Sequence, residues 1–263
     1  MKILVIGDIF SRQGRRAVFN ELPKLKKQEQ IDFVIANAEN ATHGRGLSKK
    51  HYEEIINAGV DCITMGNHTW DNPEIFEIFE TCDRIIRPYN IDLKSDFSKK
   101  GKGSIVFVIN KIAIRITNLL GSSINMNGLQ TNPFEALDEI IKHNDALIHI
   151  VDFHAETTAE KNALFLDFSS KVNLIYGTHT HIPTNDARIF NNTAYQTDLG
   201  MCGALNSVIG AQPQNIIARF RDSTKAFKMI PSEESYVFCS SLVEFDDTSG
   251  KPINIKPIVI YEN

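Results

Sequence analysis

The stretch KILVIGD, residues 2–8, is a strand-length apolar run that ends in a glycine and a carboxylate. Four later runs follow the same pattern: IDFVIANA before Glu39, VDCITMG before Asn67, ALIHIVDF before His154 and VNLIYGT before His179. In open α/β sheets, the loops after the carboxyl ends of the strands meet in one crevice. The side chains that follow these five runs are therefore expected to lie close together.

The residues at these strand ends are of types that bind transition metals. They comprise two carboxylates, two amides and four imidazoles: Asp8, Glu39, Asn40, Asn67, His68, His154, His179 and His181. This set is too large for one zinc ion with a water, and it suits two neighbouring ions that share a bridging carboxylate and a bridging hydroxide. Alternate residues of an extended segment point to the same side, so the HTH triplet at 179–181 is expected to present both imidazoles together.

Each position also has a structural interpretation when it is taken alone. Glu39-Asn40 could cap a turn, and a single His154 is more often a hydrogen-bonded structural histidine than a ligand. Arg45, which lies between two glycines after the Glu39-Asn40 pair, could contact a phosphate oxygen or point into solvent as an ordinary loop arginine. The order of all five strand ends, rather than any single one, favours a metal site.

The first third of the chain alternates between strand and helix patterns. The predicted order is strand 2–7, helix 15–29, strand 32–38, helix 49–58, strand 60–65 and a short helix opened by Asn72-Pro73. A loop with Arg12, Gly14 and Arg15 is expected before the first helix, and Ser48 is placed to cap the second. This rhythm predicts parallel strands joined by crossover helices.

The rest of the chain adds a hairpin, further helices and a final strand pair. The predicted elements are strands SIVFVIN and IAIRITNL joined at Asn110-Lys111, helix 133–143, the strand into His154, a helix from Thr157 to about 170, strand 194–198, helix 213–221 and two strands around DDTSG. Thr157 and Glu160 have the spacing of a capping box. Residues 91–103 and 121–132 are predicted as loops. No linker divides the chain, so one domain over 1–263 is the simplest prediction.

Composition narrows the class of protein. The chain has 263 residues, 42% of them hydrophobic, and a net charge of −4, which argues against nonspecific binding along a nucleic-acid backbone. Its four cysteines are widely spaced and are expected to be free thiols in a reducing cytosol. No apolar segment approaches the ~20 residues that span a bilayer. A soluble cytoplasmic protein is therefore predicted.

The ordered motifs resemble those of the calcineurin-like metallophosphoesterases, whose signature reads D-x-H, GD-x-x, GNH, H and GH-x-H. The resemblance is closest to the YmdB-like bacterial branch, and it is carried by VIGDIFSRQGR, NAENATHGRGL, TMGNHTWDN, VDFHAETTAEK, YGTHTHIPT and TAYQTDLGMCG. It implies an α/β fold, a sandwich of two mixed β-sheets flanked by helices in four layers. Phe10 stands where the broad superfamily has a histidine ligand, and Glu39 followed by Asn40 replaces an aspartate. Both departures are typical of the YmdB-like branch.

The resemblance implies a role for each residue of the set. It assigns Asp8, Asn40 and His181 to one metal ion, Asn67, His154 and His179 to the other, Glu39 to the bridge and His68 to general acid catalysis. The Asn40 amide would replace the missing imidazole. Oxygen and imidazole ligands without thiolate suit manganese, iron or zinc, and the resemblance favours iron or manganese.

The resemblance also implies a phosphodiesterase that acts on small phosphodiesters, with 2′,3′-cyclic nucleotides as the expected class. The bridging hydroxide would attack phosphorus while His68 protonates the leaving oxygen. Two divalent ions, two carboxylates and a hydroxide leave one positive charge, which matches a diester slightly better than a monoester dianion. The alternatives are a phosphomonoesterase such as a nucleotidase, and a metal-binding regulator that acts through RNA-turnover proteins. A homo-oligomer, either dimer or tetramer, is also expected.

Overall fold

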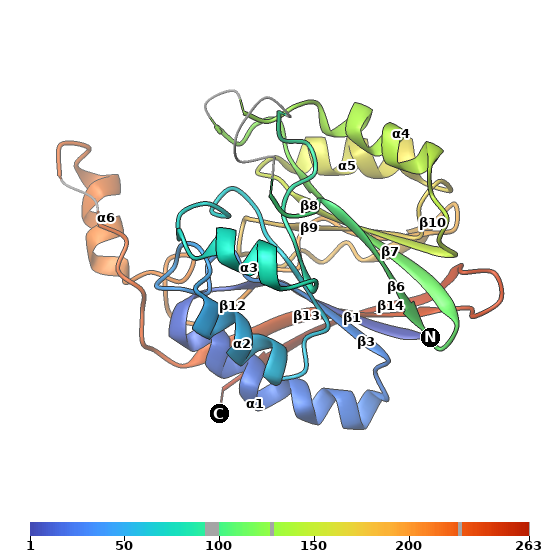
Figure 1. The fold of residues 1–263 in the computed structure, drawn as a ribbon. Coiled ribbons are helices and arrows are strands. Elements are labelled where there is room, and N and C mark those ends of the chain that lie inside the picture. The colour runs from blue at the N-terminus through green and yellow to red at the C-terminus, as the bar shows by residue number, and fades with distance from the viewer. Residues whose placement is uncertain (93–99, 127–128, 226–227, 263) are drawn as a thin grey trace.

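The computed structural model describes residues 1–92, 100–126, 129–225 and 228–262, and these residues form two mixed β-sheets (Figure 1). The first sheet runs in the order β2 (Asp8–Ile9), β12 (Met201–Ala204), β13 (Tyr236–Phe245), β1 (Lys2–Ile6), β3 (Phe33–Asn37), β4 (Cys62–Thr64) and β5 (Ile85–Ile86), with β14 (Pro252–Tyr261) also paired to β13. The second runs in the order β10 (Arg188–Phe190), β11 (Thr193–Gln196), β9 (Leu174–Thr178), β8 (Ile148–His154), β7 (Ile112–Leu120) and β6 (Ser104–Ile109).

Parallel strands form the centre of both sheets. In the first sheet, β1, β3, β4 and β5 are parallel neighbours, whereas β13 is antiparallel to β1, β12 and β14. In the second sheet, β7, β8, β9 and β11 are parallel, and β6 and β10 close the edges in antiparallel pairs. The predicted βαβ order and the predicted hairpin are both confirmed.

Within the described residues there are six helices, and five of them lie on the outer faces of the sheets. They are α1 (Ser11–Glu29), α2 (Lys49–Asn57), α3 (Ile75–Thr81), α4 (Pro133–Lys142), α5 (Thr158–Phe168) and α6 (Pro213–Arg221). Figure 1 shows α1, α2 and α3 beside the first sheet, α4 and α5 beside the second, and α6 standing away from both.

The hydrophobic core consists of separate clusters on the two faces of each sheet, because successive side chains of a strand point to opposite faces. Leu4 and Ile6 of β1 belong to the cluster under α1, α2 and α3. Ile3 and Val5 belong instead to a second cluster, which they share with Ile150 of β8 and other residues of the second sheet. A third cluster lies between the second sheet and the helices α4 and α5. The central strands are thus buried on both faces, as their continuous apolar runs require.

Helix α1 begins earlier than the sequence predicts. Arg12, Gly14 and Arg15 were expected before a helix over 15–29, but the helix starts at Ser11 and includes all three. A side-chain carbon on Gly14 would lie 2.3 Å from the carbonyl oxygen of Cys202, so glycine lets α1 pack closely on β12. This glycine marks a close approach between two elements and not a loop.

The predicted helix caps are confirmed in part. The Ser48 hydroxyl accepts the His51 N–H at the start of α2, and the Thr157 hydroxyl accepts the Glu160 N–H at the start of α5. The second half of the expected capping box, in which the Glu160 carboxylate would accept the Thr157 N–H, is not formed within the part of the chain that the structure describes. The Glu160 carboxylate instead accepts the Ser122 N–H at 2.7 Å, which ties the 121–132 segment to α5.

Several short strands escaped prediction because they are too short to show periodicity; they are β2, β5, β10 and β12. Of the two predicted loops, residues 93–99 and 127–128 lie outside the described residues. All four cysteines are free thiols, as expected. Across the described ranges, none of the helices combines the length and the apolar character that crossing a bilayer requires.

Candidate metal centre

Strands from both sheets bring the predicted residues to one place. Asp8 opens β2, Glu39 follows β3 and Asn67 follows β4 in the first sheet, while His154 ends β8 and His179 follows β9 in the second. Because these are carboxyl ends of parallel strands, the side chains converge on one region between the sheets. The centre is thus assembled across the sheet–sheet interface rather than within one sheet.

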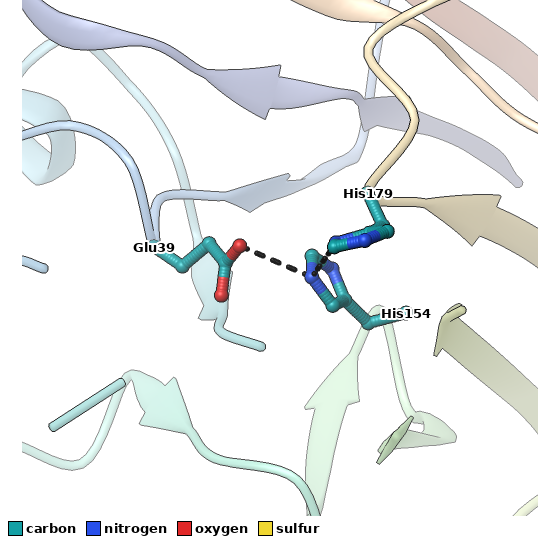
Figure 2. Close-up of side chains that lie close together, drawn as sticks. All are labelled: Glu39, His154 and His179. Carbon is teal, nitrogen blue, oxygen red and sulfur yellow. Dashed lines mark hydrogen bonds and ion pairs between the residues drawn. The ribbon is translucent and has the colours of Figure 1, made fainter. Parts of the chain in front are cut away.

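His154 lies at the middle of the tightest group. Its Nε2 atom is 3.1 Å from Glu39 Oε1, 3.0 Å from Asn67 Oδ1 and 3.0 Å from His179 Nδ1. The ligand atoms of Glu39, His154 and His179 all lie within 4.8 Å of one another (Figure 2). These four side chains include the three that the family resemblance assigns to one ion and the bridging carboxylate.

Two hydroxyl groups determine which nitrogen of His154 is free. The Thr178 hydroxyl donates to Asp152 Oδ1 at 2.7 Å, so it can only accept a hydrogen bond from His154 Nδ1, which is 2.9 Å away. The Thr64 hydroxyl donates to the other oxygen of Asp152. In the neutral form of His154, Nε2 therefore carries a lone pair that faces Glu39 and Asn67. Metal-binding histidines are commonly oriented in this way by a carboxylate network.

The HTH segment does not have the predicted extended geometry. Strand β9 ends at Thr178, and both His179 (φ +98°) and His181 (φ +66°) have positive φ angles that side chains rarely adopt. The two imidazoles consequently face different neighbours. His179 Nε2 is 3.0 Å from the Glu156 carboxylate, which leaves Nδ1 directed at His154. Such strained conformations persist where the surroundings fix them, and they cluster at functional sites.

His181, Asn40 and Asp8 form the second half of the centre. His181 Nδ1 is 2.9 Å from the carbonyl of Ile209 and donates there, so in the neutral form of His181 Nε2 carries the lone pair. Nε2 faces Asn40 Oδ1 at 3.3 Å, and the Asn40 amide N–H₂ donates to Gly44 O at 3.0 Å. Asp8 Oδ1 is 3.9 Å from the same Nε2. Three acceptor atoms thus face one another.

The charge balance favours a cation at this place. Burial raises the pKa of Asp8, which is fully buried. Burial opposes charge on His154, but the carboxylates of Glu39, Asp8 and Asp152 together outweigh it and raise the pKa of His154 to about 9. Burial and the neighbouring His154 lower the pKa of His179 to about 3. These groups therefore favour the presence of one positive charge. A proton on His154 and a metal ion would compete to supply that charge.

The donor set fits metal ions. Asp8 Oδ1 is buried and has no hydrogen-bond partner among the described residues, which is costly for a carboxylate oxygen. It lies 3.9 Å from His181 Nε2, which carries a lone pair in the neutral tautomer that donates from Nδ1 to Ile209. Carboxylate, amide and imidazole donors suit divalent transition metals. Asp8, Asn40 and His181 could hold one ion, and His154, His179 and Asn67 another, with Glu39 between the two groups.

His68 stands apart from the proposed ligands. Its backbone N–H donates to Glu39 Oε2 at 2.7 Å, which anchors the residue beside the centre. Its Nδ1 is 2.8 Å from the Asp71 carboxylate, and about a quarter of the side chain is exposed. Because Asp71 engages Nδ1, Nε2 is available to another partner. This arrangement suits proton transfer.

A cavity of about 310 Å³ opens over the centre. Its lining comprises Phe10, Glu39, Asn40, Gly44, Arg45, His68, Glu156, His179, Thr180, His181, Ile209 and Met229. The Arg45 side chain is exposed and makes no ion pair with the residues that the structure describes. Both interpretations of Arg45 therefore stay open, since it is a solvent-facing loop residue that also borders the cavity.

Gly66 explains the glycine of the GNH motif. A side-chain carbon at this position would lie 2.4 Å from the His154 ring and 2.5 Å from Glu39 Oε2. Any other residue would push these two groups apart. The glycine therefore allows strand β4 to approach the second sheet at the centre.

Several contributing residues were not predicted from the sequence. Thr178, Asp152 and Thr64 orient His154, while Glu156 contacts His179 and Asp71 contacts His68. Asp71 and Glu156 lie within three residues of predicted site residues, so a search for neighbouring carboxylates would have found them. The Thr178–Asp152 contact depends on the pairing of β8 with β9 and has no local signal.

Comparison with known proteins agrees with the motifs. The model of the YmdB-like protein family matches residues 4–258. A Mycoplasma pneumoniae protein, whose name gives phosphatase or phosphodiesterase as a provisional activity, is 49% identical over 84% of this chain and 79% of its own. The Bacillus subtilis 2′,3′-cyclic-nucleotide 2′-phosphodiesterase is 36% identical over 100% of this chain and 98% of its own.

The solved structures show the same relationship. A crystal structure described as a novel phosphatase from Mycoplasma pneumoniae superimposes with a TM-score of 0.96 at 44% identity, covering 100% of this chain and 94% of that one. The chain therefore belongs to the YmdB-like protein family.

Proposed function

We propose that this protein is a metal-dependent phosphodiesterase that hydrolyses small phosphodiesters, with 2′,3′-cyclic nucleotides as the substrate class. The observation that supports it most is that the buried Asp8 Oδ1 has no hydrogen-bond partner among the described residues and lies 3.9 Å from His181 Nε2. The Bacillus subtilis relative is named for this activity. The frame is proposed to be the four-layer sandwich, which is supported by the order of the three core clusters.

The chemistry is divided between the ions and the chain. Two divalent ions, when bound, would lower the pKa of water and neutralise phosphoryl oxygens. His68 is the proposed general acid, because Asp71 engages Nδ1 and leaves Nε2 to protonate the departing ribose oxygen. Arg45 is the proposed contact for a phosphate oxygen, since it lines the same cavity. At about 310 Å³, that cavity matches the lower range of small-molecule sites.

The substrate class is tested with matched pairs of esters on manganese-loaded protein. We expect 2′,3′-cyclic AMP to be hydrolysed faster than AMP, and bis-p-nitrophenyl phosphate faster than p-nitrophenyl phosphate. Equal or faster release of inorganic phosphate from AMP would move the assignment to a nucleotidase. If neither class is turned over by the metal-loaded protein, the regulatory alternative is favoured.

The number of ions is tested separately. Elemental analysis after reconstitution should approach two equivalents of transition metal per chain. A plateau at one equivalent with full activity would refute the dinuclear site. A single domain over 1–263, a cytoplasmic location, a homo-oligomeric state and partners in RNA turnover stay predictions.

A further inference from the structure

A buried ion pair lies directly behind the His179 segment. Lys161 of α5 and Asp198, which follows β11, are each 1% exposed, and their charged atoms are 2.6 Å apart. Neither residue lines the cavity over the centre. Burying two charges costs free energy that their attraction alone often fails to recover. The contacts of the pair with the backbone indicate what it does.

The Asp198 carboxylate holds two separate pieces of backbone. Its Oδ2 accepts the Thr180 N–H at 3.2 Å, directly after His179, and its Oδ1 accepts the Gly200 N–H at 2.8 Å. Lys161 adds a hydrogen bond to the Thr178 carbonyl at 2.9 Å, directly before His179. The strained His179 is therefore fixed on both sides by one ion pair.

The second piece of backbone leads to Asp8. The Gly200 carbonyl accepts the Asp8 N–H at 3.1 Å, and Asp8 Oδ2 accepts the His179 N–H at 3.0 Å. Gly200 has φ +82°, and a side-chain carbon there would lie 2.7 Å from Pro183, so only glycine fits. The contacts close into a ring that passes through Asp198, Gly200, Asp8, His179 and Thr180, which we call the Asp198 ring.

The Asp198 ring decides which oxygen of Asp8 is free. Because Oδ2 is occupied by the His179 N–H, Oδ1 is the atom left without a partner, and it faces His181. Without the ring, the carboxylate could rotate and the His179 backbone could relax from its positive φ. The ring therefore fixes a ligand of each proposed ion with respect to the other.

We propose that Asp198 is a positioning residue for metal binding, which acts by closing this ring rather than by its charge. The inference rests on the proposed metal centre. Groups behind metal ligands commonly contribute about 10–100-fold to metal affinity. Asp198 has that place here, because it reaches Asp8 and His179 only through the backbone.

The test compares two variants that both lack the ion pair. Lys161→Met removes the ammonium but leaves both backbone N–H groups bound to Asp198, so the ring stays closed. The double variant Lys161→Met/Asp198→Asn lacks both charges, and because an amide has one acceptor oxygen, the ring must open. Asp198→Asn alone is avoided, because it would leave the Lys161 ammonium buried without a counter-charge. In Lys161→Met, by contrast, the Asp198 carboxylate keeps its two backbone N–H donors.

The measurements are Mn²⁺ dissociation constants of the apo-proteins, their melting temperatures without metal, and the visible spectra of the Co²⁺-loaded proteins. We expect both variants to melt earlier than wild type. Only the double variant should bind Mn²⁺ more weakly, by about 10–100-fold, with a changed Co²⁺ spectrum, and excess Mn²⁺ should restore most of its activity.

Three results would overturn the inference. Wild-type affinity in the double variant would show that Asp198 only stabilises the fold. Equal weakening in both variants would assign the effect to the ion pair and not to the ring. If wild-type protein itself bound no Mn²⁺, the proposed metal centre would fail, and this inference with it.

Discussion

The half of the centre around His154 is held by side chains of buried strands, whereas the half around His181 is held by carbonyls of two loops. His154 is oriented by Thr178 and, through it, by Asp152, which both lie on central strands and are fully buried. His181 is instead oriented by the carbonyl of Ile209, and Asn40 by that of Gly44. The first half is fixed by the sheet and the second by segments outside it.

The distances follow the same division. Ligand atoms around His154 are 3.0–3.1 Å apart, whereas those around His181 are 3.3–3.9 Å apart. A preorganised site loses less free energy on binding than one that must first be drawn together. We therefore expect the ion at His154 to be the more tightly bound of the two.

The largest effect should come from breaking the tighter half. His154→Gln removes the imidazole that contacts Glu39, Asn67 and His179. Activity should fall by more than the ~100-fold that residues behind the ligands contribute. Hydrolysis of 2′,3′-cyclic AMP and of bis-p-nitrophenyl phosphate should fall together. Metal content and both initial rates check this. Retention of two metal equivalents would show that His154 is not a ligand.

The second effect belongs to a residue of neither half. His68→Gln should leave both ions bound and slow the hydrolysis of 2′,3′-cyclic AMP by about 10²–10⁴-fold, the usual range for general acid catalysis. Nitrophenolate departs without protonation, so bis-p-nitrophenyl phosphate should be affected less. The ratio of the two losses is the measurement. Equal losses, or a lost metal ion, would refute the acid role.

The looser half should respond selectively. Asn40→Ala removes the amide oxygen that faces His181, and we expect one of the two Mn²⁺ dissociation constants to rise while the other is kept. Activity should fall at low metal and recover in excess Mn²⁺. Titration with Mn²⁺ under both conditions checks this. Unchanged occupancy and turnover would show that Asn40 is only a turn residue.

The smallest effect should come from the support behind the tighter half. Thr178→Val keeps the shape of the side chain but removes the hydroxyl between His154 and Asp152. The tighter ion should then bind about 10-fold more weakly, the lower end of the range for such groups, and the weaker ion should be unaffected. Isothermal titration of the apo-protein with Mn²⁺ measures both dissociation constants. An unchanged tighter ion with a weakened second ion would contradict the prediction.

The positions of the site residues could be predicted because the signal is local. An apolar run followed by Asp8, Glu39 or His154 places each residue at a strand end, and parallel strands present those ends on the same side. The convergence of the predicted set is seen in the structure. The roles of its members, including the acid role of His68, stay predictions.

The details that escaped prediction depend on which strands become neighbours. Thr178 meets Asp152 only because β8 pairs with β9, and this pairing has no sequence signal. The positive φ angles at His179 and His181 are imposed by contacts with distant segments, which include Asp8 and Ile209. Gly14 misled the prediction of α1 because a close approach to Cys202 cannot be seen in one dimension.

Phe10 lines the cavity over the centre and packs beside the His181 half of it. Its ring is 2% exposed and stands edge-on to His181, with centroids 5.5 Å apart. A side-chain carbon on Gly44 or Gly210 would lie within 2.9 Å of the ring, so both glycines pack against it. The Gly44 carbonyl orients Asn40, and the residue before Gly210 supplies the carbonyl that orients His181.

The Phe10 side chain therefore separates the two loops whose carbonyls orient Asn40 and His181. Because both loops pack against this ring, neither can shift without the other. A smaller side chain at position 10 would therefore be expected to loosen the carbonyls of Gly44 and Ile209 together, and with them the orientation of Asn40 and His181.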